Sequence, residues 1–168
     1  ITLEPGFLNN ISLNINLDDM TPSIIFENND ILIASNDQGN YFMPSMGVDM
    51  IGALNNSDGY LVYFNGNDTQ TLSLTGMPAS METVITLNPY SINYIAFTPQ
   101  EAMLVEQVFA DIPVFIVVDH IGNYFVPELG INYIDESGGM LPGRGYMVYH
   151  GTDGVIEFTY PNGLSKEN

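Results

Sequence analysis

The chain of 168 residues contains no cysteine and no tryptophan, and Arg144 and Lys166 are its only lysine or arginine residues. The lack of cysteine excludes disulfide bonds, thiolate metal sites and cysteine nucleophiles. Twenty acidic residues give a net charge of -18, which excludes nucleic acid and anionic membrane surfaces as partners. The longest apolar run, residues 114–118, is too short to cross a bilayer, so we expect no membrane insertion.

What the chain has instead is apolar and uncharged polar content. Apolar residues make up 45% of the chain, enough to bury roughly 70% of the unfolded surface, whereas charged residues make up 13%. An acidic, lysine-poor surface suits a protein outside the cell, where salt shortens the range of charge repulsion to about 8 Å. We therefore expect an extracellular or cell-surface location. Because the sequence opens on Ile1 and not on Met, we expect a processed product or a piece of a longer protein.

The sequence repeats itself. Residues 7–51 align with residues 90–134 at a shift of 83 without a gap, and the shift becomes 86 after an insertion near residues 138–140. GNYFMP at 39–44 returns as GNYFVP at 122–127, and GYLVY at 59–63 returns as GYMVY at 145–149. This predicts repeat A over residues 1–75, a linker over 76–84, repeat B over 85–161 and a flexible tail over 162–168.

Each repeat reads as a strand, a short helix and then hairpins, which predicts a mainly β, α+β fold. A capping box at Thr98–Glu101 predicts a helix over 98–112, and a shorter helix begins at Thr21. Turn residues at 36–40 and 119–123 predict hairpins. We expect two further hairpins, in which residues 60–64 pair with 71–74 and residues 146–149 with 155–160. The two repeats are expected to pack their apolar faces about a pseudo-twofold axis, as a sandwich or barrel-like body.

These elements resemble the tandem β-rich accessory modules of secreted and cell-surface proteins from Bacteroidota-type bacteria. The resemblance is carried by an aromatic-Asn-apolar opening strand at 90–95, a hairpin with Pro at 114–127, a Gly-Ile stretch at 130–134 and a Gly-Tyr strand at 143–149, with their counterparts in the first repeat. Phe7 and Tyr90 stand where the family has Trp. The resemblance implies an extracellular accessory module and no catalytic residue.

The residues themselves also argue against an enzyme. Most acidic residues lie in expected turns or helix starts, where carboxylates accept backbone hydrogen bonds, and no Gly-x-Ser-x-Gly elbow is present. His120 and His150 have no spacing typical of zinc ligands. A hydrolase, which is one further hypothesis, would need a cleft holding two close carboxylates. Calcium is the one candidate cofactor, because it prefers carboxylate and amide oxygens in loops. Its candidate ligands are Asn55, Asp58, Asn65 and Asp68.

Two further sets of residues are candidates for binding. Repeated tyrosines would form a sugar-binding platform if they face outward. These are Tyr41, Tyr60, Tyr63, Tyr124, Tyr146 and Tyr149. Arg144 lies in a Gly/Pro turn beside the insertion and is a candidate for pairing with a carboxylate of a neighbouring subunit or ligand.

We expect a non-enzymatic structural or adhesion module of a bacterial surface protein or filament. Its expected partners are other copies of itself or other surface-protein domains. The alternative is a carbohydrate-binding module of a secreted polysaccharide-degrading enzyme, with a glycan as partner.

Overall fold

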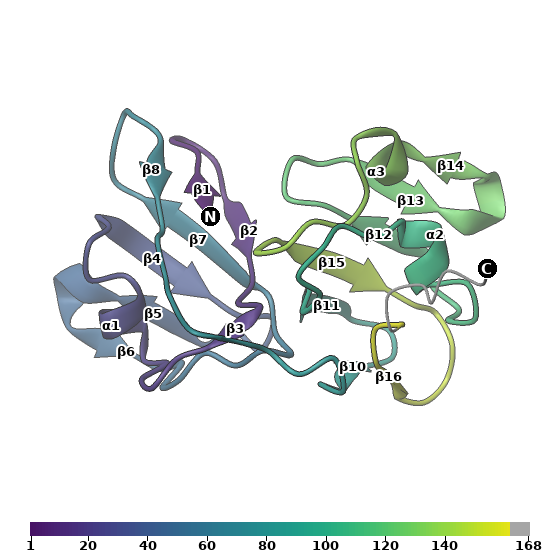
Figure 1. The fold of residues 1–168 in the computed structure, drawn as a ribbon, viewed down its shortest axis with the longest axis horizontal. Coiled ribbons are helices and arrows are strands. Elements are labelled where there is room, and N and C mark those ends of the chain that lie inside the picture. Colours follow the sequence, from purple (N-terminus) through teal and green to yellow (C-terminus); the bar gives the residue numbers. More distant parts are fainter. Residues whose placement is uncertain (162–168) are drawn as a thin grey trace.

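The structure is a computed structural model that describes residues 1–161, and it is mainly β, with 34% strand and 11% helix. The first half of the chain, purple to blue in Figure 1, lies beside the second half, green to yellow. Each half contributes one five-stranded sheet, and three two-stranded sheets accompany them. Among the described residues no sheet closes into a barrel, so the barrel-like alternative is wrong. The tail expected at 162–168 lies outside the described residues.

The elements follow one another in a similar order in the two halves. Strands of the first half and the segment after it are β1 (Thr2–Leu3), β2 (Asn9–Ile11), β3 (Ile15–Asn16), β4 (Ile31–Ser35), β5 (Tyr41–Met43), β6 (Val48–Asp49), β7 (Tyr60–Phe64), β8 (Gln70–Thr71) and β9 (Met77–Pro78). Strands of the second half are β10 (Ile85–Leu87), β11 (Ile92–Ala96), β12 (Ile116–Val118), β13 (Tyr124–Val126), β14 (Ile131–Asn132), β15 (Gly145–Tyr149) and β16 (Ile156–Phe158). Helical elements are α1 (Pro22–Ile25), α2 (Val105–Val108), α3 (Tyr133–Glu136) and the 3-10 turns η1 (Pro44–Met46) and η2 (Pro127–Leu129).

Both five-stranded sheets are antiparallel and have the same strand order. The first runs β2-β7-β4-β5-β6 and the second runs β11-β15-β12-β13-β14. In β7 the side chains of Tyr60, Val62 and Phe64 are buried, while the residues between them are partly exposed, as the twofold side-chain period of a strand requires. Tyr146 and Val148 alternate in the same way in β15.

The turns expected at 36–40 and 119–123 join β4 to β5 and β12 to β13. The Asn36 side-chain oxygen accepts the backbone N–H of Gln38 at 3.1 Å and of Asn40 at 3.0 Å. Asp119 accepts two backbone N–H groups of its own turn in the same way, at 2.9 and 2.8 Å. These side chains replace the backbone partners that a tight turn lacks, which is why Asn and Asp mark such turns in a sequence.

The two hairpins expected after β7 and β15 are wrong. β8 pairs with β1, and β16 pairs with β10. The reason is that β7 and β15 are interior strands whose two edges already bond to neighbours, β2 and β4 in one sheet and β11 and β12 in the other. The chain that follows each interior strand therefore returns to the strand that opens its half.

The helix expected over 98–112 is much shorter in the structure, where α2 spans only Val105–Val108. Met103 forms a β-bridge with Met140, with N–H to oxygen distances of 3.0 and 2.7 Å in the two directions, which holds the preceding segment out of a helix. The capping box is not used. Instead, the carboxylate of Asp135 accepts the N–H of Val105 at 2.6 Å and provides the cap from another part of the chain.

The first strands of the two halves correspond at a shift of 84, not 83. The Asn9 side chain accepts the N–H of Glu4 at 2.7 Å and donates to the oxygens of Glu4 and Phe7, each at 3.1 Å. Asn93 makes the equivalent bonds to Asn88 and Ser91 at the same three distances. Pairing Asn10 with Asn93 in the sequence was therefore off by one residue.

The two halves have separate hydrophobic cores, which corrects the expectation that their apolar faces pack together. One cluster of buried side chains draws its members from Leu3 to Leu72, and the other from Ile85 to Tyr160. The expected linker at 76–84 is partly ordered structure, since β9 pairs with β3 and Ala79 is buried.

Backbone contacts join the halves, and they are reciprocal. Ile11 bridges to Arg144, and Ile95 bridges to Asp58. Ser12 donates its N–H to Gly143 at 3.1 Å, and Ala96 donates to Ser57 at 3.0 Å. Each half thus presents the end of its edge strand to the segment that precedes the interior strand of the other half.

Candidate functional site

The outer face of the second five-stranded sheet, away from its core, is apolar. In the register of this sheet, Tyr149 lies between Ile92 on β11 and Ile116 on β12, and Met147 lies opposite Val118. Side chains at directly opposed positions of an antiparallel pair share a face. Together with Phe115 these residues line a groove of about 330 Å³. None of the six lining side chains carries a charge.

Aromatic rings lie in the groove and beside it on the β13 side. Tyr124 lies opposite Val118 in the register of β13, and its ring meets that of Tyr133 at 5.1 Å between centroids. The ring of Phe115 meets Tyr149 at 6.1 Å. Both pairs are perpendicular, with an angle of 88° between ring planes. Phe115 is 53% exposed, so a large part of this ring is available to another molecule.

Tyr90, next to the start of β11, has a strained backbone. Its φ of 55° lies in the left-handed region, and it is the one residue other than glycine with positive φ among those described. The position 84 residues earlier is Gly6, at φ 75°, which adopts this conformation without a Cβ clash. The hydroxyl of Tyr90 donates to Asp153 at 2.6 Å, and 59% of the residue is exposed.

The first sheet presents a less aromatic face at the corresponding positions. Leu32 occupies the place of Phe115 and Gly6 the place of Tyr90, whereas Ile33 and Tyr63 occupy the places of Ile116 and Tyr149. Leu32 is 41% exposed, so it provides a matched reference for Phe115. The two halves therefore share strand order but differ in what they offer to solvent.

The six tyrosines proposed as a platform do not share one surface. Tyr60 and Tyr146 are buried, and their hydroxyls accept the backbone N–H groups of Asn55 at 2.9 Å and Leu141 at 2.6 Å. Burial raises the pKa of both hydroxyls well above the ordinary value. These two residues were wrong as ligand contacts. Tyr41, Tyr63, Tyr124 and Tyr149 retain exposed area, and only the last two belong to the outer face of the second sheet.

The four candidate calcium ligands do not gather at one point. Asn55 and Asp58 bond to each other at 2.6 Å before β7, whereas Asn65 and Asp68 follow it, so the strand separates the pairs by roughly 17 Å. The Asn55 oxygen already accepts hydrogen bonds from Ser57 and Asp58 of its own loop. Within residues 1–161, no group of three or more His, Asp or Glu side chains is placed to hold a metal ion.

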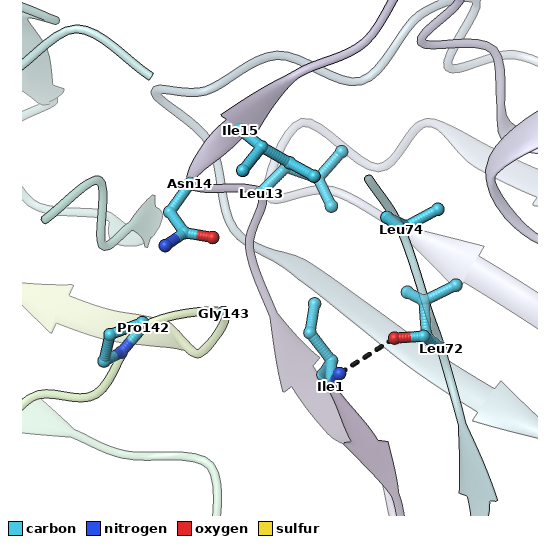
Figure 2. A pocket seen from close by; sticks show the side chains of 8 residues that line it. All are labelled: Ile1, Leu13, Asn14, Ile15, Leu72, Leu74, Pro142 and Gly143. Atoms are coloured by element: carbon cyan, nitrogen blue, oxygen red, sulfur yellow. Dashed lines mark hydrogen bonds between the residues drawn. The ribbon is translucent and has the colours of Figure 1, made fainter. Parts of the chain in front are cut away.

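A second hollow lies where the halves meet, with a volume of about 260 Å³. Figure 2 shows Ile1, Leu72 and Leu74 on one side of it and Pro142 and Gly143 on the other. The amide of Asn14 also lines it and donates to Gln100 at 3.2 Å. Neither this hollow nor the groove on the outer face is lined by a carboxylate, so neither has the acid pair that glycoside hydrolysis needs.

Arg144 lies at this junction between the two halves of one chain. The sequence had suggested a contact with a carboxylate of another molecule instead. Its guanidinium donates to the carbonyl oxygen of Thr2 at 2.9 Å, and its backbone bridges to Ile11. Burial lowers its pKa from the ordinary value. Burial also lowers the pKa of His120, and the nearby positive charge of Arg144 lowers it further. Arg144 thus contributes to the attachment of one half to the other, and His120 lies near it in the second half.

The corresponding positions on the other side of the junction hold two carboxylates. Asp37 accepts the N–H of Tyr94 at 3.1 Å across the junction. Burial, with a contribution from nearby Asp58, raises the pKa of Asp37 from its ordinary value. The remaining histidine, His150, is buried against Thr152 and the carbonyl of Leu87, at 2.9 and 3.2 Å. Its two ring nitrogens are thus occupied by structural contacts.

Sequence reasoning identified Tyr124 and Tyr149 but missed the rest of the outer face. Ile92, Phe115 and Met147 carry no motif, and the strained Tyr90 looked like an ordinary aromatic at the start of a strand. The sequence did contain one indication, because Tyr90 stands where the first half has Gly6. The alignment at a shift of 83 pairs Tyr90 with Phe7 and therefore hides this replacement of glycine by tyrosine.

Comparisons of the chain with known proteins add no relative. No family model, no curated protein and no solved structure matches it. In the described part of the chain, no helix has the length and apolar character required to cross a membrane.

Proposed function

We propose that the chain is a non-enzymatic structural or adhesion module of an extracellular bacterial surface protein or filament, and that it acts through the outer face of its second sheet. The observation that carries this proposal is the groove lined by six uncharged side chains and flanked by exposed rings. Exposed apolar patches of this kind mark contacts with other macromolecules. The acidic, lysine-poor composition supports a location outside the cell.

We also propose that the two halves descend from one duplicated unit and meet about a pseudo-twofold axis. Three features support this: the identical strand order of the two sheets, the matching hydrogen bonds of Asn9 and Asn93, and the reciprocal bridges at the junction. The aromatic residues that enrich the outer face of the second sheet then arose in one copy, because Gly6 and Leu32 correspond to Tyr90 and Phe115.

The geometry favours a protein partner over a sugar. Sugars stack on flat ring faces and need hydrogen-bonding side chains beside the rings. On this face the ring pairs are perpendicular, and the groove is lined by four aliphatic side chains, Phe115 and Tyr149. A protein surface with its own apolar side chains fits such a groove better than a hydroxyl-rich ligand does.

Retention on chemically defined surfaces tests the proposal. The chain should be retained more strongly on methyl-terminated than on hydroxyl-terminated monolayers, and Phe115→Ser should reduce this difference while Leu32→Ser leaves it intact. Equal behaviour of the two variants would contradict the assignment of the face. A glycan array hit that disappears in Phe115→Ser would favour the carbohydrate-binding alternative.

Location needs a separate test. Antibodies against the chain should label intact cells of the bacterium that makes it. Labelling only after the cells are permeabilised would refute the extracellular part of the proposal.

A further inference from the structure

We infer that the outer face of the second sheet binds the same face of a second copy of this chain, as a twofold dimer. This inference rests on the proposed function, because it names the partner that the apolar face would contact.

The exposed area is close to what a stable dimer needs. Tyr90, Ile92, Phe115, Tyr124 and Tyr133 are between 36% and 59% exposed. Large side chains bury about 150–250 Å² each when fully covered, so these five offer on the order of 500 Å². A standard interface buries about 800 Å² per partner, of which about 65% is apolar in homodimers. The face therefore supplies an area comparable to the apolar part of such an interface.

Charge also favours contact at this face. Elsewhere two copies repel each other, because each carries a net charge of -18. The central rows of the face, from Ile92 through Tyr149 to Ile116 and from Met147 to Val118, contain no ionisable side chain except the tyrosine. Pairing these central rows with themselves buries no unpaired charge, which would otherwise be a large cost, and the carboxylate of Asp153 lies beside Tyr90 at the edge of the face.

The face carries both a hollow and projecting rings. A twofold contact requires one surface to be complementary to itself, so that a group on each copy enters a recess on the other. Phe115 lines the groove and is 53% exposed, so its ring forms part of the recess and of its raised border. The recess holds about 330 Å³, enough for an aromatic side chain of the second copy.

Tyr90 adds an independent observation. A residue with a Cβ pays roughly 1–2 kcal/mol for the left-handed conformation, and Gly6 shows that the unit is built without that cost. Strain held at an exposed aromatic is consistent with a binding role, since such strain clusters where contacts require it. The hydrogen bond to Asp153 fixes the ring at the edge of the face.

Sedimentation velocity on the chain, from about 1 µM to 1 mM, tests the inference. We expect a monomer–dimer equilibrium that tightens between 0.1 M and 1 M NaCl, because salt screens the repulsion between the acidic copies. Phe115→Ser should raise the dissociation constant at least about 30-fold, as for a central aromatic of an interface. Leu32→Ser, the matched change on the first sheet, should alter it less than about threefold.

Tyr90→Gly separates binding from folding. Relief of the left-handed strain offsets the lost hydrogen bond and the added freedom of the unfolded chain, so the urea midpoint should stay close to that of the parent chain. The dimer should nevertheless weaken by about tenfold. An unchanged dissociation constant in this variant would overturn the role given to Tyr90.

Failure of the inference is distinguishable from failure of the proposed function. A chain that stays monomeric at 1 mM in 1 M NaCl, an oligomer larger than a dimer, or equal weakening by Phe115→Ser and Leu32→Ser would each overturn the twofold pairing. The retention assay on monolayers decides the proposed function independently, because it is run at concentrations where the chain is monomeric.

Discussion

Two adjacent asparagines should respond in opposite ways to the same truncation. Asn9 and Asn10 are 5% and 1% exposed. The Asn9 side chain satisfies the N–H and oxygen of Glu4 and the oxygen of Phe7. The Asn10 oxygen and nitrogen are buried, and neither has a partner among the described residues. Burial alone predicts equal effects, whereas hydrogen bonding predicts a large difference.

Asn9→Ala removes three hydrogen bonds of 3.1 Å or less to backbone groups of Glu4 and Phe7, and a longer one to the Val62 oxygen at 3.3 Å that adds little. At about 1 kcal/mol each, the cost is about 3 kcal/mol, a substantial part of the roughly 5–15 kcal/mol that stabilises an ordinary domain. Asn10→Ala removes two unsatisfied polar atoms and leaves a small cavity, so these effects offset each other to within about 1 kcal/mol.

Urea unfolding at pH 7, followed by tyrosine fluorescence and by far-ultraviolet circular dichroism, measures both changes. The midpoint of Asn9→Ala should fall clearly, and that of Asn10→Ala should remain near the parent value. If Asn10→Ala proves as costly as Asn9→Ala, the side chain of Asn10 has a partner that the hydrogen-bond argument omits, and the reasoning is refuted.

Two other predictions concern the junction between the halves. Gly145→Ala places a methyl group 2.7 Å from the Ile11 oxygen and should lower the free energy of unfolding in urea by about 2 kcal/mol. Gly151→Ala, where the methyl group enters open space, should lower it by less than about 0.5 kcal/mol. Similar urea midpoints for the two variants would contradict this prediction. Asp37 has a raised pKa, so its ionised form is disfavoured in the folded state, and its contribution to stability falls as the pH rises through that pKa. Asp37→Asn should therefore raise the urea midpoint at pH 7, with the gain vanishing in acid where Asp37 is protonated, and a gain that persists there would contradict the assignment.

Local patterns in the sequence predicted the parts of the fold that depend on local chemistry. Asn36 and Asp119 marked their turns because each side chain bonds to the backbone of its own turn. The apolar run Tyr60–Phe64 predicted a strand, which is β7 in the structure. Both signals act over a few residues, which is why they are visible without coordinates.

Long-range competition decided what the sequence did not reveal. The capping box at Thr98 was a sound local signal, but the bridge between Met103 and Met140 outweighed it. β8 was expected beside β7, yet the edge of β7 was already occupied. For the candidate site, the repeated tyrosines were chosen because the repetition is visible in the sequence. Tyr60 and Tyr146, however, are buried and belong to the two hydrophobic cores. The outer face emerges only when the register of β11, β15 and β12 is known.

The position of Arg144 has a practical consequence for proteolysis. Trypsin cleaves after lysine and arginine, and within residues 1–161 the only such bond is that between Arg144 and Gly145. That bond lies where Arg144 bridges to Ile11 and where the Cβ of any residue replacing Gly145 would meet Asn10. A protease can cleave it only after the segment around Arg144, including the start of β15, leaves the folded structure, so the rate of this single cut reports how often this segment opens, without a label or a mutation.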